Sequence, residues 1–378
     1  MGSVSGRIGV GIIGVGRAGW GMQCQEVARR QDRFTLVAGC DTFAPWRDRF
    51  HAAYPDAQIT EDIDALLKNP AVDVVSIATR TCDHFLHAKK ALSAGKHVLL
   101  EKPMCTTHAE ARALKETAAQ SAGTLFIRHN RRFEPGFCAI RDILQEGLLG
   151  RIAEIKLSRV SFGRRNDWQT LLQFGGGQLG NWGSHIIDHG LQFLGAPAKP
   201  LRSVSAYLDR IAAVGDAEDH VKIVLQGHTG TVVDIEISGG AALPAPEYMI
   251  WGTRGALSCR GSRVNLRYLD PDVPLGRRIP HEGVPGAEFV LPDGSLPLGD
   301  RTIGSNFGEP ETLTWVEEER RVPSEEPGKI WDALYDALVH GKVFPVQLEE
   351  AIAVMEIIDA ARQDTRFAIA GLATSPDS

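Results

Sequence analysis

Short apolar runs alternate with helical patterns through the first third of the chain. The apolar runs predict β-strands over residues 8–13, 35–40, 72–78, 97–100 and 125–127. Apolar positions spaced three and four apart predict helices over residues 18–30, 47–53, 62–68 and 107–121, with a further helix that ends near residue 94. Strands that alternate with helices are typical of a parallel, doubly wound sheet, so this part is predicted to be an α/β Rossmann domain.

Beyond residue 150 the pattern changes to strands separated by Gly-rich turns. Strands are predicted over residues 151–161, 220–226, 231–238 and 248–251, and one helix over residues 184–193. Successive strands without helices between them indicate an antiparallel sheet. Residues 262–312 are rich in Gly and Pro, which predicts long loops or an insertion. Helices are expected over residues 329–340 and 349–363, and residues 373–378 are expected to be frayed.

Length and pattern together predict two domains. A chain of 378 residues is too long for one ordinary core. We expect a dinucleotide-binding domain over residues 1–128 and a substrate-binding and oligomerisation domain over residues 129–378. The second domain is predicted to be α+β, with C-terminal helices over about residues 327–366.

Composition narrows the classes of partner. Hydrophobic residues make up 43% of the chain and charged residues 23%, as in globular proteins. The net charge of −6 gives no global attraction for nucleic acid or an anionic membrane, and no apolar run of about 18 residues predicts a membrane span. The six cysteines form no Cys-x-x-Cys pair and no zinc pattern with histidine. We therefore expect reduced thiols, a cytoplasmic protein and no metal site.

A glycine motif follows the first predicted strand and opens the first predicted helix. Its sequence is Gly14-Val15-Gly16-Arg17-Ala18-Gly19. Gly14 permits a tight turn, Gly16 lets the backbone approach a pyrophosphate, and Gly19 lets helix and strand pack closely. The N–H groups and dipole of the helix N-terminus favour an anion. The motif predicts a dinucleotide site in which Arg17 and Ala18 also take part.

An acidic residue ends the second predicted strand. Asp41 follows Gly19 by 22 residues, where a carboxylate can accept hydrogen bonds from the adenosine ribose and repel a 2′-phosphate. This favours NAD over NADP. The alternative is that the nearby Arg47 holds a 2′-phosphate.

Glu101-Lys102-Pro103 follows the strand over residues 97–100. In a doubly wound sheet ligands lie beyond the carboxyl ends of strands. Lys102 can act as a general base if burial and a nearby positive nicotinamide lower its pKa. The alternative is a solvated lysine at the surface.

The segment Gly95-Lys96-His97-Val98-Leu99-Leu100-Glu101-Lys102-Pro103 resembles a signature of the glucose–fructose oxidoreductase / inositol dehydrogenase (Gfo/Idh/MocA) family. Further segments of the chain are similar to the same family: Ala78-Thr79 with His84, Arg131-Arg132-Phe133 with Pro135, Gly175-Gly176-Gly177 with Leu179, Gly183, His185 and Asp188, and Gly252-Thr253-Arg254-Gly255. The resemblance covers nearly the whole chain. It implies a Rossmann domain followed by an open, mostly antiparallel sheet. One face of that sheet would carry the substrate pocket, and the other commonly packs in homo-oligomers.

The resemblance also implies roles for single residues. Thr79, His84 and Glu101 would border the NAD site, where Lys102 lies beside the reacting hydroxyl. His185 would be a second acid/base. The Lys102–Pro103 peptide is often cis in the family.

The chain departs from the family at one position. Many relatives carry an Asp four residues before the histidine, and this chain has Asn181 there. An amide can hydrogen-bond a hydroxyl but cannot take its proton. A proton relay through Lys, Asp and His, as in those relatives, therefore cannot be assigned in full to this chain. We assign Asn181 to substrate positioning and proton transfer to Lys102 and His185. Asp188 lies three residues after His185, so it shares a helix face with it and either binds substrate or orients a buried side chain.

Aromatic and basic residues before the second signature suggest what the pocket binds. Trp168 and Trp182 offer apolar faces to the C–H face of a sugar ring. Arg164 and Arg165 suit a carboxylate, sulfonate or phosphate, which favours an anionic or heavily hydroxylated sugar. The alternative is that these arginines pair with acids at the surface.

Arg128 and Asn130 lie at the predicted junction of the two domains. Residues of this kind either face the substrate cleft or tie the domains together. We expect both to bind substrate.

Three functions fit these features. The first is an NAD-dependent dehydrogenase that oxidises a ring hydroxyl of a sugar. The second, implied by some relatives, is an NAD-dependent glycosidase that oxidises the ring transiently, eliminates the aglycone, adds water and returns the hydride. The third is a nucleotide-binding regulator on the same fold, against which the presence of Lys102 and His185 argues.

Overall fold

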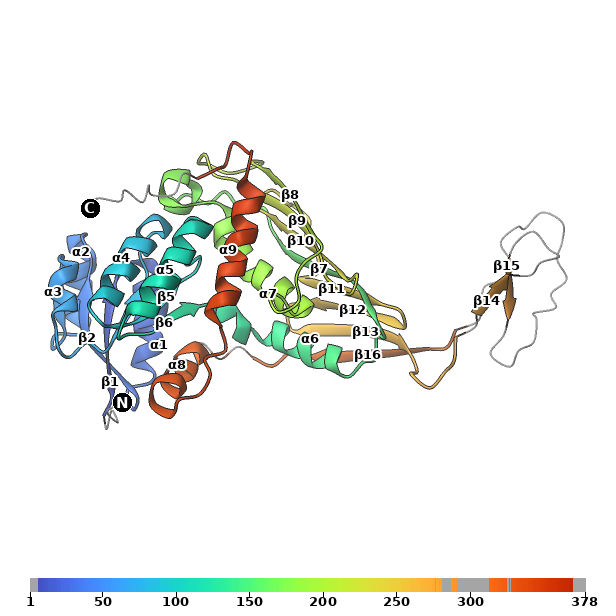
Figure 1. The fold of residues 1–378 in the computed structure, drawn as a ribbon, viewed down its shortest axis with the longest axis horizontal. Helices are drawn as coiled ribbons and strands as arrows, with labels where there is room; N and C mark the ends of the chain where they lie inside the picture. The colour runs from blue at the N-terminus through green and yellow to red at the C-terminus, as the bar shows by residue number, and fades with distance from the viewer. Residues whose placement is uncertain are drawn as a thin grey trace.

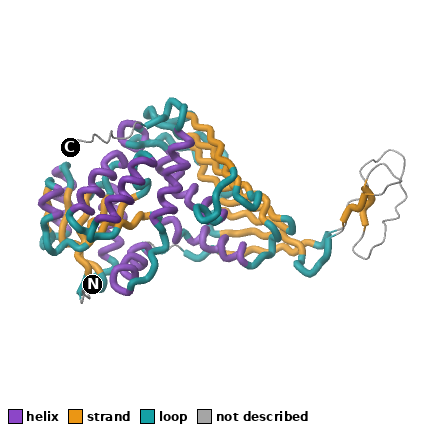
Figure 2. Tube along the Cα trace, viewed as in Figure 1, coloured by secondary structure: helices purple, strands orange, loops and turns teal. Residues whose placement is uncertain are grey.

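The computed structural model describes residues 6–275, 277–280, 287–290, 313–324, 326 and 328–369. The chain forms a helix-covered parallel sheet followed by a larger sheet whose strands lie to one side of it (Figures 1 and 2). Helix α9 (Leu348–Arg362), in red in Figure 1, lies between the two and contacts α5 of the first and α7 of the second.

The first sheet has six parallel strands in the order β3-β2-β1-β4-β5-β6. Its strands are β1 (Ile8–Ile13), β2 (Phe34–Cys40), β3 (Gln58–Thr60), β4 (Val74–Ile77), β5 (His97–Glu101) and β6 (Leu125–Arg128). The strands β1 and β4 are buried along their whole length, as expected when helices cover both faces of a sheet. The predicted Rossmann fold is confirmed. The short strand β3 was not predicted.

Helices connect these strands in the predicted places. They are η1 (Gly19–Cys24, a π-helical segment), α1 (Gln25–Ala28), α2 (Ala44–Ala53), α3 (Ile63–Leu67), α4 (Thr81–Ser93) and α5 (His108–Gln120). Thr107 caps α5, because its side chain accepts from the Glu110 N–H while the Glu110 carboxylate accepts from the Thr107 N–H.

The second sheet has eight strands in the order β16-β13-β12-β11-β7-β10-β9-β8. Only the pair β7 and β10 is parallel, and the other pairs are antiparallel. The strands are β7 (Ile152–Val160), β8 (Ser203–Asp209), β9 (His220–Gln226), β10 (Val232–Ser238), β11 (Tyr248–Gly252), β12 (Gly255–Arg260), β13 (Arg263–Leu269) and β16 (Trp315–Arg321). This confirms the predicted mostly antiparallel sheet.

Helices α6 (Pro135–Gln145) and α7 (Ser184–Leu194) lie on one face of this sheet (Figure 1). The second part also contains η2 (Asn130–Phe133), η3 (Trp168–Thr170), η4 (Leu172–Phe174), η5 (Leu179–Gly183, also π-helical) and α8 (Lys329–His340). Helix α7 packs on β7 and β10, where Ile155, Leu157 and Ile235 point inward and are buried. The alternation of buried and exposed residues along β7, β10 and β13 fits a sheet with one covered face.

One part of the pattern-based prediction was wrong. Residues 263–269 form strand β13 and not a loop, because Val264 and Leu266 alternate with polar residues and fill the covered face. A hairpin follows, made of β14 (Arg277–Pro280) and β15 (Ala287–Val290). Within the segment 262–312, residues 276, 281–286 and 291–312 lie outside the described residues, as does the predicted frayed end 373–378. Strands β8, β12 and β16 and helix α6 were not predicted.

The C-terminal helix α8 returns to the first domain. The ring of Trp331 is fully buried against Phe34 of β2, and Asp332 forms an ion pair with Arg30 at 2.7 Å. The two parts of the chain therefore share a buried contact, which fixes them relative to each other. Among the described residues, no helix is long and apolar enough to cross a membrane.

Candidate active site

A cleft of about 610 Å³ lies beyond the carboxyl ends of β1, β2 and β4. The strand order reverses between β1 and β4, which is where open α/β sheets bind ligands. Of the predicted cofactor residues, the following line this cleft: Gly14, Gly16, Arg17, Ala18, Asp41 and Thr79.

The glycine turn fits a dinucleotide. Gly14 has φ +87°, a left-handed conformation that L side chains rarely adopt. A Cβ on Gly19 would lie 1.9 Å from the Gly14 backbone oxygen, so only glycine lets the helix pack this closely. A Cβ on Gly16 would meet only Trp46, at 3.5 Å, so it would point into the cleft itself. These positions match the needs of a pyrophosphate held at a helix N-terminus.

Two carboxylates stand at the ribose end of the cleft. Asp41 and Glu61 both line it. The guanidinium of Arg47 is already engaged, because it pairs with Glu61 at 3.2 Å and donates to the backbone oxygens of Asp41 and Thr42 at 2.9 Å. Arg47 itself does not line the cleft.

A loop of the second domain reaches across the cofactor cleft. The Asp167 carboxylate forms an ion pair with Arg17 of the glycine turn at 3.0 Å. The Gln169 side-chain oxygen accepts a longer hydrogen bond from Arg17 at 3.4 Å. Trp168 and Gln169 line the cofactor cleft and the adjoining pocket. The Arg17–Asp167 pair thus links the Rossmann turn directly to the substrate domain.

The adjoining catalytic pocket, of about 240 Å³, surrounds Lys102. The Lys102 ammonium donates to the backbone oxygen of Asn181 at 3.0 Å and to its side-chain oxygen at 3.2 Å. Burial lowers the pKa of Lys102 to about 8, while Glu101 opposes the shift. The Lys102–Pro103 peptide is cis. Strand β5 is thus followed directly by a lysine that can lose its proton near neutral pH.

Glu101 is supported by a buried charge network. Its carboxylate accepts from Gln23 at 2.9 Å and from Arg128 at 2.9 Å. Arg128 also pairs with Glu26 at 2.5 Å, and Glu26 accepts from the Trp331 indole at 2.9 Å. Burial alone would raise the pKa of Glu101, but the positive charges of Arg128 and Lys102 hold it below its usual value.

This network corrects the prediction for Arg128. The side chain is completely buried and both its ion pairs are internal, so it does not reach a substrate. It holds Glu101 in place and ties β6 to α1.

His84 connects the two loops that flank the pocket. Its Nδ1 lies 2.8 Å from the Pro103 backbone oxygen and its Nε2 lies 3.3 Å from that of Thr79. Burial lowers the pKa of His84, so the ring is neutral and donates from one nitrogen. The ring fixes the backbone beside Lys102 while also lining the pocket.

His185 faces the same pocket from α7. Its side chain is buried, and its Nδ1 is buried with no hydrogen-bond partner among the described residues. Burial and the neighbouring Lys102 lower its pKa well below the ordinary value, so the imidazole is neutral. An unpaired buried nitrogen in a pocket indicates a partner supplied by a ligand.

The structure places Asp188 away from this pocket, which corrects its predicted role. It is buried and its carboxylate accepts two hydrogen bonds from Arg132, at 2.6 and 2.8 Å. Arg132 also pairs with Glu350 of α9 at 2.7 Å. Asp188 thus anchors the crossover into the second domain. Of the two roles expected for it, it orients a buried side chain and does not bind substrate.

Five of the predicted substrate residues line the catalytic pocket, and they are Asn130, Arg165, Trp168, Asn181 and Trp182. Arg165 forms a bidentate pair with Asp167 at 2.9 Å. Arg164 is exposed, donates to the Ala212 backbone oxygen at 3.2 Å and lines neither the cleft nor the pocket. The structure therefore does not bring Arg164 to the site.

Some site residues were missed from the sequence. Arg131 lines the catalytic pocket and its guanidinium lies 5.2 Å from the Trp182 ring. Gln23 and Glu26 support Glu101 from η1 and α1. Polar residues three apart on the buried side of an otherwise apolar helix were the signal that could have revealed them. Among the described residues, no cluster of His, Cys, Asp or Glu could hold a metal ion.

Two family models match the chain. Residues 8–129 match an oxidoreductase family with an NAD-binding Rossmann fold, and residues 137–258 match a Gfo/Idh/MocA C-terminal domain. The chain belongs to the Gfo/Idh/MocA oxidoreductase family. As a member, it is an NAD(P)-dependent oxidoreductase.

Several proteins are similar over much of the chain. A scyllo-inositol 2-dehydrogenase (NADP⁺) of Bacillus subtilis is 27% identical, over 83% of this chain and 82% of the relative. A D-glucoside 3-dehydrogenase of Escherichia coli is 31% identical, over 52% of this chain and 56% of the relative. The solved structure of the yvaA oxidoreductase from Bacillus subtilis shares the fold, with a TM-score of 0.75 at 20% identity over 95% of this chain and 96% of that one.

Proposed function

We propose that this Gfo/Idh/MocA protein is an NAD-dependent dehydrogenase that oxidises a ring hydroxyl of a sugar or cyclic polyol. The observation that carries the proposal is Lys102. Its ammonium lies in the pocket next to the dinucleotide cleft, is held by Asn181, and has a pKa of about 8. Bound NAD would accept the hydride from the carbon that carries the hydroxyl.

The residues of the pocket are assigned to proton transfer and to substrate binding. Lys102, once neutral, takes the hydroxyl proton at Nζ. His185 lines the same pocket, where its neutral ring can hydrogen-bond to a second hydroxyl or to the same oxygen, and Asn181 orients the ring of the sugar through its amide. Trp168 and Trp182 contribute aromatic faces for the C–H side of a sugar. The pocket therefore supports recognition of a polyhydroxylated ring.

The charges in the pocket are compatible with an acidic group on the substrate. Arg17, Lys102, Arg131 and Arg165 line the pocket together with Glu101, and the one carboxylate of Asp167 pairs with both Arg17 and Arg165. Arg164 lies outside the pocket. The names of two relatives, a scyllo-inositol dehydrogenase and a D-glucoside dehydrogenase, refer to uncharged polyols, so the proposal covers neutral polyols and sugar acids.

The ribose end of the cleft supports NAD as the preferred cofactor. A 2′-phosphate would approach the carboxylates of Asp41 and Glu61. Arg47, the alternative phosphate ligand, is tied to Glu61 and to two backbone oxygens. The related inositol dehydrogenase is named for NADP. We therefore propose the NAD preference for this chain and not for its relatives.

One contact favours the redox-neutral glycosidase as a second candidate. The Arg17–Asp167 pair and Trp168 extend across the cofactor cleft. A cofactor that is enclosed between turnovers suits a reaction that returns the hydride to the same substrate.

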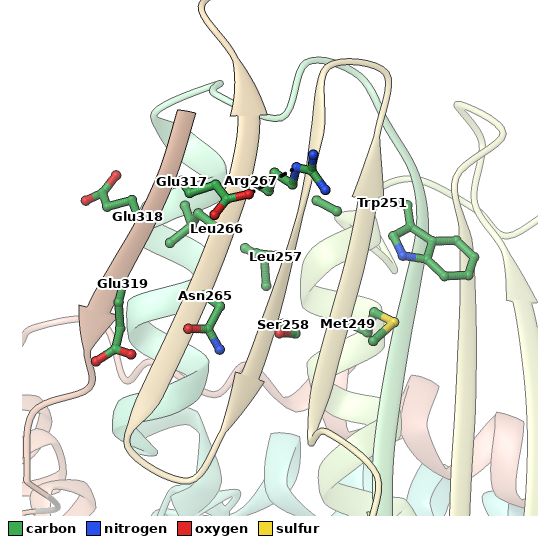
Figure 3. A pocket seen from close by; sticks show the side chains of 11 residues that line it. Met249, Trp251, Leu257, Ser258, Asn265, Leu266, Arg267, Glu317, Glu318 and Glu319 are labelled. Atoms are coloured by element: carbon green, nitrogen blue, oxygen red, sulfur yellow. Dashed lines mark ion pairs between the residues drawn. The ribbon is translucent and has the colours of Figure 1, made fainter. Parts of the chain in front are cut away.

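We further propose that the chain forms a homo-oligomer through the open face of its second sheet. A hollow of about 580 Å³ on this face is lined by Met249, Trp251, Ser258, Asn265, Arg267 and Glu317, as Figure 3 shows. Trp251 is 41% exposed and Trp315 37% exposed. Exposed tryptophans on an uncovered sheet face are typical of a surface that another subunit covers. Sedimentation of the wild type against Trp251→Glu tests this: the variant should dissociate.

The dehydrogenase proposal is tested with two panels, free sugars with cyclic polyols, and chromogenic glycosides of the same sugars. Absorbance of NADH and release of aglycone are followed together. NADH that accumulates without aglycone release is the expected result. Aglycone release that needs NAD yet leaves no net NADH would establish the glycosidase instead.

A further inference from the structure

A second cavity of about 240 Å³ adjoins the catalytic pocket at Trp182. It lies where strands β7 and β10 end, and the segment 239–247 and Gln178 complete its wall. Trp182 lines both this cavity and the catalytic pocket, so the two spaces share one side chain. Neither the proton transfer nor the cofactor site uses any other residue of the second cavity.

The indole of Trp182 stands between two arginines, one from each space. Arg131 lines the catalytic pocket and Arg159 lines the second cavity. Their guanidinium groups lie 5.2 and 5.7 Å from the Trp182 ring. The edge of the ring approaches His185, with centroids 6.1 Å apart. These contacts hold Trp182 at the boundary of the two spaces, close to His185.

The wall of the second cavity is rich in neutral polar groups. Hydroxyl-bearing residues line it, and they are Ser158, Ser161 and Ser238. The side-chain oxygen of Gln178 is buried without a hydrogen-bond partner among the described residues. The serine hydroxyls and the Gln178 side chain give this wall both donors and acceptors for a hydroxylated ligand.

The buried charge in this cavity is already compensated. Arg159 pairs with Glu134 at 3.1 Å, and its ring contacts with Trp182 and Tyr248 fix it further. The carboxylate of Glu247 accepts from the Gly261 backbone N–H at 3.0 Å. Arg260 also lines the cavity; it is exposed and opposite in charge to Glu247 of the same wall. With the charges of the wall balanced in this way, the cavity suits an uncharged group with several hydroxyls better than an ion or an alkyl chain.

We propose that the second cavity binds a second sugar unit, so that the substrate is a glycoside in which the oxidised ring occupies the catalytic pocket and its linked neighbour lies beyond Trp182. This inference rests on the proposed sugar dehydrogenase or glycosidase activity. It further specifies that the substrate contains at least two linked sugar units. The serine hydroxyls and the Gln178 side chain of the wall hydrogen-bond to hydroxyls of the second unit, and the indole packs against the linkage.

Ala245 offers a way to fill the cavity without touching the catalytic pocket. It lines the cavity and is exposed, so a larger side chain there does not need space in the core. Ala242 lies in the same segment, is also exposed and is not part of the lining, which makes Ala242→Trp a matched control for Ala245→Trp.

The experiment compares methyl α- and β-glucosides and galactosides with maltose, cellobiose, melibiose and lactose, whose non-reducing rings match them. For wild type, Ala245→Trp and Ala242→Trp, NAD-dependent turnover and calorimetric binding to the NADH complex are both measured. We expect wild type to prefer one disaccharide over its methyl glycoside by roughly tenfold or more. Ala245→Trp should remove that preference and leave the methyl glycoside unchanged, while Ala242→Trp keeps it.

Other outcomes separate this inference from the proposed function. Turnover of methyl glycosides without a preference for any disaccharide, or a preference that survives Ala245→Trp, overturns the second sugar site. Preferential binding of a disaccharide that Ala245→Trp removes, without turnover of any compound, supports the second site and contradicts the proposed activity. No binding of any panel member overturns the second sugar site, while the panel of free sugars and cyclic polyols decides the proposed activity separately.

Discussion

The Lys102 ammonium donates to two oxygens of Asn181, the backbone oxygen at 3.0 Å and the amide oxygen at 3.2 Å. Both acceptors are uncharged. Asn181 therefore fixes the direction of the lysine without adding a negative charge that would hold its proton. The residue that replaces the family's aspartate thus positions the base and leaves its pKa low.

Activity should rise with pH through the pKa of Lys102. Burial lowers that pKa to about 8, and only the neutral amine can accept the hydroxyl proton. Below about pH 8 the rate of sugar oxidation is expected to rise about tenfold per pH unit, and above it to level off. Initial rates of NADH formation over a pH series measure this. A rate that does not change across this range would mean that Lys102 is not the base.

Asn181→Asp should move this pH dependence upward. A carboxylate at the position of the amide would lie next to the ammonium and favour its charged form, which raises a pKa by about 1–3 units. The inflection of kcat/KM against pH is expected to shift by at least about one unit, with lower activity at neutral pH. Asn181→Ala, which adds no charge, is the control. The same inflection in Asn181→Asp and wild type would contradict the assigned contact.

Asp41→Ala should relax the choice of cofactor. Loss of the carboxylate removes both the ribose acceptor and the repulsion of a 2′-phosphate. The ratio of kcat/KM for NAD over NADP is expected to fall about tenfold or more, which corresponds to about 1.4 kcal/mol. Glu61→Gln provides a comparison, because it releases Arg47 and should add to the effect. An unchanged ratio in both variants would refute the proposed NAD preference.

Arg128→Met should destabilise the fold. Arg128 is completely buried and compensates the charges of Glu26 and Glu101. Removing one partner of a buried ion pair costs about 3–5 kcal/mol in the free energy of unfolding. Urea unfolding measures the loss, and the exposed Arg164→Ala should stay within about 0.5 kcal/mol of wild type. Equal stability of Arg128→Met and wild type would show that the buried network is not structural.

Local patterns in the sequence predicted every strand of the first sheet except the short β3. The glycine turn, Asp41 and the strand before Lys102 are short-range features, and the structure places them around the cleft and the pocket that adjoins it. Strand β13 was missed because Gly and Pro downstream of it obscured a short alternation of Val264 and Leu266 with polar residues.

The partners of charged residues could not be read from the sequence. Arg128 and Glu26 are 102 positions apart, and Arg17 and Asp167 are 150 apart. Which of several arginines faces a ligand depends on these distant pairs, so Arg128 and Arg164 were assigned to the substrate while Arg131 was overlooked. The resemblance to the family supplied Lys102 and His185, but it did not supply the contact that Asn181 makes with Lys102.

The most direct test of the central claim is single-turnover oxidation of an accepted sugar by wild type and by Lys102→Met, with NAD binding measured separately by fluorescence. We predict that Lys102→Met binds NAD as wild type does and forms NADH about 10²–10⁴-fold more slowly. Formation of NADH at the wild-type rate by Lys102→Met would contradict the assignment of Lys102 as the base.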